Sequence, residues 1–411
     1  MEPEKALNWC AMLDIQNYIE SELVTFVIDI LRECKIYEDE VDKIINSLNS
    51  IYNKLNNTKT KNIILSEIEI LQCKTVLQSK PVKMHVVLTT KCNLKCIMCH
   101  VRKTEYEINE TYQKIIREYI PYLEKISWQG GELFLYDGFM DLVKFAYKNK
   151  VSQEFVTNGL LLDDNLIQMI SDYGIDLSIS IDSVQPETYE NIRKGAKFSN
   201  LLDVLKKLYA YNVKNKTIKY SMSVVVMSLN YKEIEKIINF AIKYDFSTIY
   251  FQRYIPKEKQ DFLEPSEEEK EYILRKIFEF KKNIEICDKI TISTNIGKEF
   301  EINTNEKLGV SKTISCKEHS LSGKNDTTKI KEKLFCIAPW KTLFLDCNNF
   351  TKFSCYCEPF KTSDKIDKIW NCESIVQYRE SIIQNKLYKC CDSFCRNAGE
   401  DGVDIRKFGW K

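Results

Sequence analysis

The residues best suited to metal or redox chemistry in this chain are its cysteines. The 411-residue sequence holds 16 of them, unevenly distributed. Three fall between Cys92 and Cys99, eight fall between Cys336 and Cys395, and five are scattered. In a large chain that is not secreted, clustered cysteines bind metal more often than they form disulfides. The distribution therefore predicts two metal sites, one at each cluster.

The first cluster lies in the segment KCNLKCIMCH, directly after a β-forming run at 84–90. Its spacing is Cys92-x3-Cys96-x2-Cys99. Thiolates are soft ligands that suit iron–sulfur clusters and zinc. Three thiolates leave one iron of a four-iron cubane without a protein ligand, and an open metal position is where chemistry takes place. The motif predicts a reactive [4Fe–4S] cluster, with half of a zinc site as the alternative.

Four further motifs follow in chain order. They are GGE (130–132), TNG (157–159), SISIDS (178–183) and ETYENIRKGAKF (187–198). With the cysteines, this series resembles the radical S-adenosylmethionine (SAM) superfamily over about residues 83–396. The resemblance implies a [4Fe–4S] cluster that binds SAM. It also implies one-electron cleavage of SAM to methionine and a 5′-deoxyadenosyl radical, which abstracts a hydrogen atom from a substrate. The residues that it implies for SAM binding are Gly130, Gly131, Glu132, Asn158, Ser180, Asp182, Arg193, Val225 and Met227.

The resemblance assigns separate parts of SAM to these residues. The glycines let the backbone approach a ligand closely, and the Glu132 carboxylate accepts hydrogen bonds from the methionine amino group. Ser180 and Asp182 lie where family members bind the ribose hydroxyls and the methionine part of SAM. Arg193 corresponds to the arginine that meets the SAM carboxylate.

Apolar residues are expected against the adenine. Val225 and Met227 come at the end of the fifth predicted strand and would pack on this base. Met98 departs from the family pattern, because an aromatic residue usually precedes the third cysteine. A thioether is flexible and polarizable, so it is still suited to cover an adenine face.

The carboxy-terminal cysteines resemble the SPASM and twitch extensions of the same superfamily, which hold auxiliary clusters. The four ligands favoured by this resemblance are Cys336, Cys355, Cys391 and Cys395. Cys357 and Cys390 are near-equal substitutes, because each lies one or two residues from a favoured ligand. The cysteine run of a full two-cluster domain is absent, which favours one auxiliary [4Fe–4S] cluster over two. A structural zinc ion is the alternative.

The elements that position these motifs alternate along the chain. β-rich runs occur at 84–90, 126–130, 154–159, 176–182, 220–227 and 247–254, with amphipathic segments between them. Strands that alternate with helices indicate βαβ units and a parallel sheet. Six strands predict an α/β fold with a partial (β/α)6 barrel. The predicted organisation is a helical extension (1–80), the radical SAM core (81–256), a helix and polar linker (257–333) and a small SPASM/twitch-like domain (334–411).

Composition narrows the function classes. The formal net charge is +1, and no apolar run is long enough to span a bilayer, so we expect a cytoplasmic protein with no nucleic-acid or membrane partner. The preferred substrate is a peptide or protein, modified by a cross-link, a thioether or epimerisation. Alternatives are a dehydrogenase or epimerase of a sugar, aminoglycoside or other small molecule, and a non-enzymatic zinc-binding module. The enzyme would need an electron donor such as flavodoxin or ferredoxin.

Overall fold

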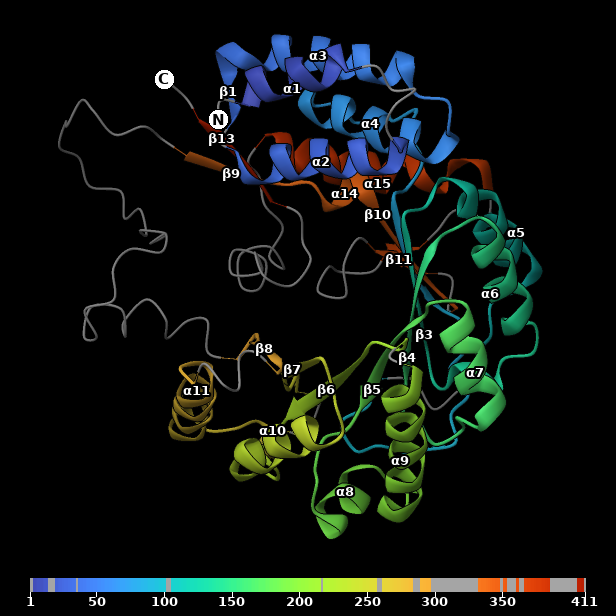
Figure 1. Cartoon of the computed structure of the whole chain (residues 1–411), viewed down its shortest axis with the longest axis vertical. Coiled ribbons are helices and arrows are strands. Elements are labelled where there is room, and N and C mark those ends of the chain that lie inside the picture. Colours follow the sequence, from blue (N-terminus) through green and yellow to red (C-terminus); the bar gives the residue numbers. More distant parts are fainter. Residues whose placement is uncertain are drawn as a thin grey trace, which may run out of the picture.

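The computed structural model describes most of the chain. The described residues are 3–13, 19–34, 36–100, 105–215, 217–256, 261–283, 289–296, 332–347, 350–352, 360–361, 366–384 and 405–409. Its centre is a curved sheet with helices on the outer face (Figure 1). The six predicted strands are β2 (Lys83–Val87), β3 (Lys125–Gln129), β4 (Ser152–Thr157), β5 (Asp176–Ser180), β6 (Tyr220–Val226) and β7 (Thr248–Arg253). They are parallel neighbours in this order, which confirms the predicted α/β class.

Two further strands extend the parallel sheet beyond the six. β8 (Thr291–Thr294) pairs with β7, and β10 (Thr342–Asp346) pairs with β2. Beyond β10, the short strands β11 (Phe350–Lys352) and β12 (Phe360–Lys361) add an antiparallel edge. The sequence did not predict β8 or β10 as barrel strands, because four or five residues carry little periodicity and β10 is remote in sequence from its partner.

The outer face is covered by helices from every crossover. These are α5 (Glu110–Tyr119), α6 (Phe139–Lys148), α7 (Asp164–Asp172), α8 (Pro186–Ile192), α9 (Phe198–Asn215), α10 (Ile234–Lys243) and α11 (Glu267–Lys281). Single turns add η3 (Ile120–Tyr122), η4 (Leu133–Leu135), η5 (Tyr231–Glu233) and η6 (Asp261–Leu263). Alternate strand residues such as Trp128, Phe155 and Met222 are buried in this helix-covered core. Ser266 caps α11 in a capping box with Glu269.

The amino-terminal extension is helical, as predicted, and has its own apolar core. It comprises α1 (Pro3–Met12), α2 (Glu20–Glu33), β1 (Ile36–Tyr37), η2 (Glu38–Glu40), α3 (Val41–Lys54) and α4 (Thr58–Leu71). Its core includes Leu7, Val27 and Leu48. The polar run NNTKTKN at 56–62 predicts a loop, and this prediction is wrong because α4 begins at Thr58. The Asn57 side chain caps this helix by accepting from the N–H groups of residues 59 and 60.

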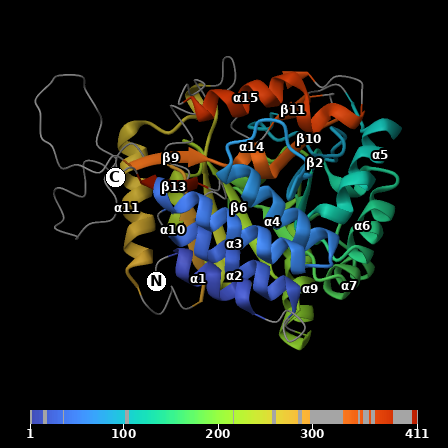
Figure 2. The same ribbon diagram turned by 90° about the horizontal axis from the view of Figure 1, so that it is seen from above.

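The carboxy-terminal segment packs against that extension. Its elements are β9 (Glu332–Cys336), α14 (Ala338–Lys341), η7 (Ile366–Asn371), α15 (Glu373–Ile383) and β13 (Ile405–Gly409). β13 lies between β1 and β9 in a three-stranded sheet. Seen from above, α14 lies between α15 and α4 (Figure 2) and contacts both helices. Among the described helices, none has both the length and the apolar character that crossing a bilayer requires.

Candidate functional site

The loop after β2 carries the first cysteine cluster. Cys92 and Cys99 are exposed, and Cys96 is half-buried. Backbone hydrogen bonds hold the loop, both within it and to the end of α8. The N–H of Cys99 donates to the Cys96 carbonyl (3.2 Å), and the N–H of Ile97 donates to the carbonyl of Ile192 at the end of α8 (3.0 Å). The three thiols are therefore presented from one fixed loop at the carboxyl end of the sheet.

Gly130 and Gly131 let the loop after β3 approach the cysteine loop. A Cβ at Gly131 would lie 2.0 Å from the Lys91 carbonyl oxygen, and one at Gly130 would lie 2.6 Å from that of Thr89. The N–H of Glu132 donates to the Lys91 carbonyl at 2.8 Å. The close approach predicted for these glycines is therefore to the backbone of the cysteine loop, which a side chain would displace.

Glu132 links three loops at this end of the sheet. Its fully buried carboxylate accepts from the Thr157 hydroxyl (2.6 Å) and from the N–H of Asn158 (2.9 Å). The Asn158 amide donates in turn to the side chain of Asn93, next to Cys92 (2.8 Å). The sequence predicted that Glu132 receives the methionine amino group of SAM. Here both carboxylate oxygens accept from donors within the protein, and the residue braces the cysteine loop.

Asp182 and Arg193 form a buried ion pair beside Cys96. The Nη2 of Arg193 lies 2.7 Å from the Asp182 carboxylate, and its Nη1 lies 4.0 Å from the Cys96 sulfur. The side chains are only 1% and 6% exposed. Burial raises the pKa of the Asp182 carboxyl, and the adjacent Arg193 charge opposes that rise. The Asp182 carboxylate also accepts from the N–H of Val225 (2.9 Å).

Two buried donors in this cluster have no hydrogen-bond acceptor among the residues that the structure describes. They are the Nε of Arg193 and the hydroxyl of Tyr189. Tyr189 was missed from the sequence, although its position four residues before Arg193 would place both on one helical face. The N–H of Arg193 does donate to the Tyr189 carbonyl (2.8 Å). Buried donors without acceptors are uncommon, and at a strand end they indicate a site for an acceptor that is not protein.

The residues expected against the adenine form a separate apolar cluster. Met98 and Met227 are buried in it, and Val225 and the Cys96 side chain pack against it. Tyr254, Ile192 and Leu263 complete its buried members. Residues more than 100 positions apart in sequence therefore meet at the cysteine loop, and their contact with adenine stays a prediction.

Ser180 belongs to a hydroxyl-lined inner face of the sheet. In β5 to β8, the inner-face residues alternate along each strand with residues that are buried in the outer core. These inner-face residues form two rows that run across the strands. One row is Ser178, Ser221, Thr248 and Thr291, and the other is Ser180, Ser223, Tyr250 and Ser293. Gln252 donates to the Ser223 hydroxyl at 2.5 Å. The concave side of these strands is therefore rich in hydrogen-bonding groups without charge.

The cysteine loop is chemically suited to an iron–sulfur cluster. Burial raises the pKa of the Cys96 thiol to about 11, and among the nearby charges that of Arg193 opposes this most strongly. A bound metal would deprotonate the thiol outright. Each thiolate of a cubane binds a different iron. Within the described ranges, no three His, Cys, Asp or Glu side chains converge on a single metal-ion position.

The carboxy-terminal cysteines are only partly described. Cys336 ends β9 and is half-buried. The other favoured ligands, Cys355, Cys391 and Cys395, lie outside the described residues, as do Cys357 and Cys390. The auxiliary ligand set therefore stays a prediction.

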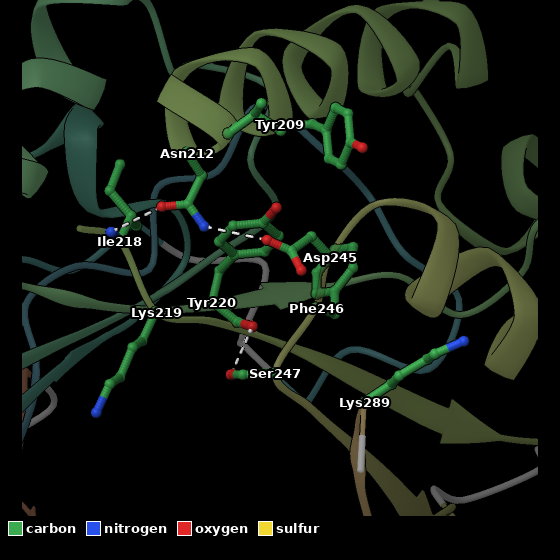
Figure 3. A pocket seen from close by; sticks show the side chains of 10 residues that line it. Tyr209, Asn212, Ile218, Lys219, Tyr220, Asp245, Phe246, Ser247 and Lys289 are labelled. Atoms are coloured by element: carbon green, nitrogen blue, oxygen red, sulfur yellow. Dashed lines mark hydrogen bonds between the residues drawn. The ribbon is translucent and has the colours of Figure 1, made fainter. Parts of the chain in front are cut away.

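A pocket of about 500 Å³ lies at the opposite ends of the strands (Figure 3). Its lining residues Lys219 and Ser247 directly precede β6 and β7, and Lys289 lies two residues before β8. Asn212 accepts from the N–H of Ile218 and donates to the carboxylate of Asp245. The side chains of Lys219 and Lys289 point in different directions (Figure 3). This pocket is separate from the cysteine loop and has no convergent charged groups.

Comparison with known proteins identifies the central region. Residues 86–241 match the family model of the radical SAM superfamily. The GTP 3′,8-cyclase of Synechocystis sp. is 27% identical over 201 residues, which are 46% of this chain and 60% of that enzyme. The match therefore spans less than two thirds of that relative.

Two solved structures share the fold over most of the chain. Streptococcus suis SuiB bound to S-adenosylmethionine has a TM-score of 0.57 at 14% identity, covering 91% of this chain and 83% of SuiB. Native anSMEcpe with bound AdoMet and the Cp18Cys peptide has a TM-score of 0.52 at 17% identity, covering 80% of this chain and 93% of that protein. SuiB has also been solved with its precursor peptide SuiA.

Proposed function

From a chain whose residues 86–241 form a radical SAM domain, we propose an enzyme that generates a substrate radical with SAM and a [4Fe–4S] cluster. The observation that carries this proposal is the fixed loop of Cys92, Cys96 and Cys99, next to a buried arginine with an unused donor. When bound, the cluster and SAM supply one-electron cleavage to a 5′-deoxyadenosyl radical, which abstracts hydrogen from the substrate.

The residues of this chain would bind and orient those groups. The three thiolates hold the cluster, and the braces at Gly131 and Glu132 keep their loop in position. Met98, Met227 and Val225 offer an apolar surface next to Cys96, which suits a purine base and excludes water from it. Ser180 at the end of β5 is suited to bind ribose hydroxyls.

We favour a peptide as the substrate. The two hydroxyl rows of the inner face match amide donors and acceptors, which a peptide backbone supplies in number. SuiB and anSMEcpe, which share the fold, were solved with peptides.

A sugar or aminoglycoside is the second candidate. Its hydroxyl groups would use the same uncharged rows. In either case an auxiliary [4Fe–4S] cluster, held by Cys336 and three of the later cysteines, would accept an electron from the substrate radical. A flavodoxin or ferredoxin would supply the first electron.

Release of 5′-deoxyadenosine tests the radical chemistry. Protein reconstituted anaerobically should release it when given SAM and dithionite, and should contain about eight irons, four in each cubane. The C92A/C96A/C99A variant should lose the release and retain about four irons. The control is C34A/C73A, which removes two cysteines of the amino-terminal extension and should change neither value. Undiminished release from the triple variant would reject the proposal.

Deuterium transfer distinguishes the substrate classes. A short peptide encoded beside the gene, made fully deuterated, should give deuterated 5′-deoxyadenosine by mass spectrometry, whereas GTP should give no new product. Conversion of GTP, or transfer only from a deuterated aminoglycoside, would overturn the preference for a peptide.

A further inference from the structure

Arg193 has a position that the SAM-carboxylate role does not explain. Its guanidinium lies between the Asp182 carboxylate (2.7 Å) and the Cys96 sulfur (4.0 Å), and both charged side chains are almost fully buried. A guanidinium whose function was only to meet a substrate carboxylate would not need a buried acid as its permanent partner. The pair therefore places beside Cys96 a cation that is held by the protein itself.

The pair is rigidly held from both sides. Asp182 accepts from the N–H of Val225 (2.9 Å), and its own carbonyl accepts from the Asn230 side chain (2.6 Å). The backbone of Arg193 is fixed by its bond to the carbonyl of Tyr189 (2.8 Å). Asn230 also donates to the carbonyl of Val225 (2.9 Å), so the end of β6 is part of the same frame. The positive charge cannot move away from Cys96 without breaking this network.

A fixed charge at this distance affects the electron affinity of a cluster. Reduction adds a negative charge, which a nearby cation and N–H donors to the cluster sulfurs stabilise. The effect is stronger in a buried site, where the effective dielectric constant is low. Arg193 approaches the Cys96 sulfur with Nη1 (4.0 Å) and holds the Asp182 carboxylate with Nη2 (2.7 Å), so the cation stands between the carboxylate and the thiol. The net influence of the pair on the cluster is therefore that of a partly neutralised cation.

We propose that the buried Arg193–Asp182 pair sets the reduction potential of the cluster held by Cys92, Cys96 and Cys99. Arg193 raises the potential, and Asp182 limits that rise while it holds the guanidinium against Cys96. This inference rests on the proposed function, because it requires a cluster on these cysteines. It assigns Arg193 and Asp182 as positioning and tuning residues, which act before SAM arrives.

The test is a redox titration of the cluster in the absence of SAM, monitored by electron paramagnetic resonance. Four proteins with the carboxy-terminal cysteines Cys391 and Cys395 replaced by Ala, to remove the auxiliary signal, are compared. From highest to lowest, the midpoint potentials should rank D182N, the parent, R193M/D182N and R193M. At the parent midpoint, the ratio of reduced to oxidised cluster in R193M should be at least tenfold lower, which corresponds to 59 mV for one electron.

The matched control is Lys197→Met. Lys197 lies in the segment after α8 and pairs with Glu190 in solvent (2.7 Å), so removing its charge should not change the potential. R193K keeps the charge without the planar donor and should lie between the parent and R193M. If R193M does not retain iron, the other two variants decide the question. The midpoint potential of D182N should lie above that of the parent, and that of R193M/D182N should lie below it.

The two possible failures are distinguishable. If the parent binds no cluster, the proposed function fails. If it binds a cluster but the four potentials coincide, or D182N lies below the parent, the tuning role is wrong. An unchanged potential with weaker SAM binding in R193M would support the carboxylate role instead.

Discussion

Two buried arginines in this molecule differ in how completely they are bonded. Arg379 on α15 donates to the carbonyls of Pro339, Thr75 and Trp370 and to the side chain of Asn371, at 2.8 to 3.0 Å. Arg193 has one carboxylate at bonding distance, a sulfur at 4.0 Å and an Nε without an acceptor. A fully satisfied buried cation holds structure together, whereas an incompletely satisfied one is available to a ligand.

The surroundings of the two arginines differ in the same way. Around Arg379, the amino-terminal extension and the carboxy-terminal segment are joined by further bonds, such as that of the Trp340 indole to the Lys74 carbonyl (2.6 Å) and the buried Lys341–Glu67 ion pair. At the cysteine loop, Tyr189 also has a hydroxyl without an acceptor. The guanidinium of Arg379 is fully bonded at the junction, whereas the guanidinium of Arg193 at the strand ends is not.

The largest effect is expected at the junction. R379A removes four hydrogen bonds and leaves buried acceptors unpaired, so the free energy of unfolding should fall by at least about 4 kcal/mol. Urea denaturation of R379A and R379K measures this. R379K should recover only part of the loss, because an ammonium has no planar fork. A loss below about 1 kcal/mol would contradict the structural role.

A second substitution should restore the stability that is lost when Arg193 is replaced. No such second substitution is expected for Arg379, which has no carboxylate partner among the described residues. R193M leaves the Asp182 charge buried without its partner, at a cost of about 3 kcal/mol. Adding D182N removes that charge, so R193M/D182N should recover most of the stability. Denaturation of both single variants and the double variant forms the cycle. An additive result would show that the two side chains do not act as a pair.

A smaller effect on stability is expected where the loop after β3 contacts the cysteine loop. G131A places a Cβ 2.0 Å from the Lys91 carbonyl, so the cysteine loop must shift, at about 2 kcal/mol. Reconstituted G131A should therefore bind less iron than the parent. G138A is the control, because its Cβ would meet no atom within 4 Å and any cost there comes from the positive φ of 89°. Equal iron retention in G131A and the parent would contradict this account.

The smallest effect is a pH dependence. Burial raises the pKa of Glu132 above its usual 4.5, although Thr157 and Asn158 oppose this. The folded protein therefore keeps this proton when the unfolded chain has lost it, and this contribution to stability is lost as pH rises through the folded pKa. The stability of the parent minus that of E132Q should decrease with pH above 4.5. A stability difference that rises with pH would show that folding lowers the pKa of Glu132 instead of raising it.

Local patterns sufficed for much of the site. The spacing of Cys92, Cys96 and Cys99 identified the loop, and six alternating strands identified the sheet, because both signals lie within short segments. Met98, Met227 and Val225 were each predicted for the same surface, and they share one apolar cluster. The start of α4 at Thr58 was missed because a single capping side chain at Asn57 overrode a polar composition.

The sequence by itself determined which residues could do chemistry, since thiols, glycines and strand-end polar groups are properties of residue type and spacing. Only the tertiary structure decided how they are partnered. The pairing of Asp182 with Arg193 depends on α8 returning the chain to the strand ends, and the bonds of Arg379 depend on β10 joining the sheet beside β2. Burial and hydrogen-bond satisfaction depend on three-dimensional neighbours, which is why two arginines of identical chemistry differ in role.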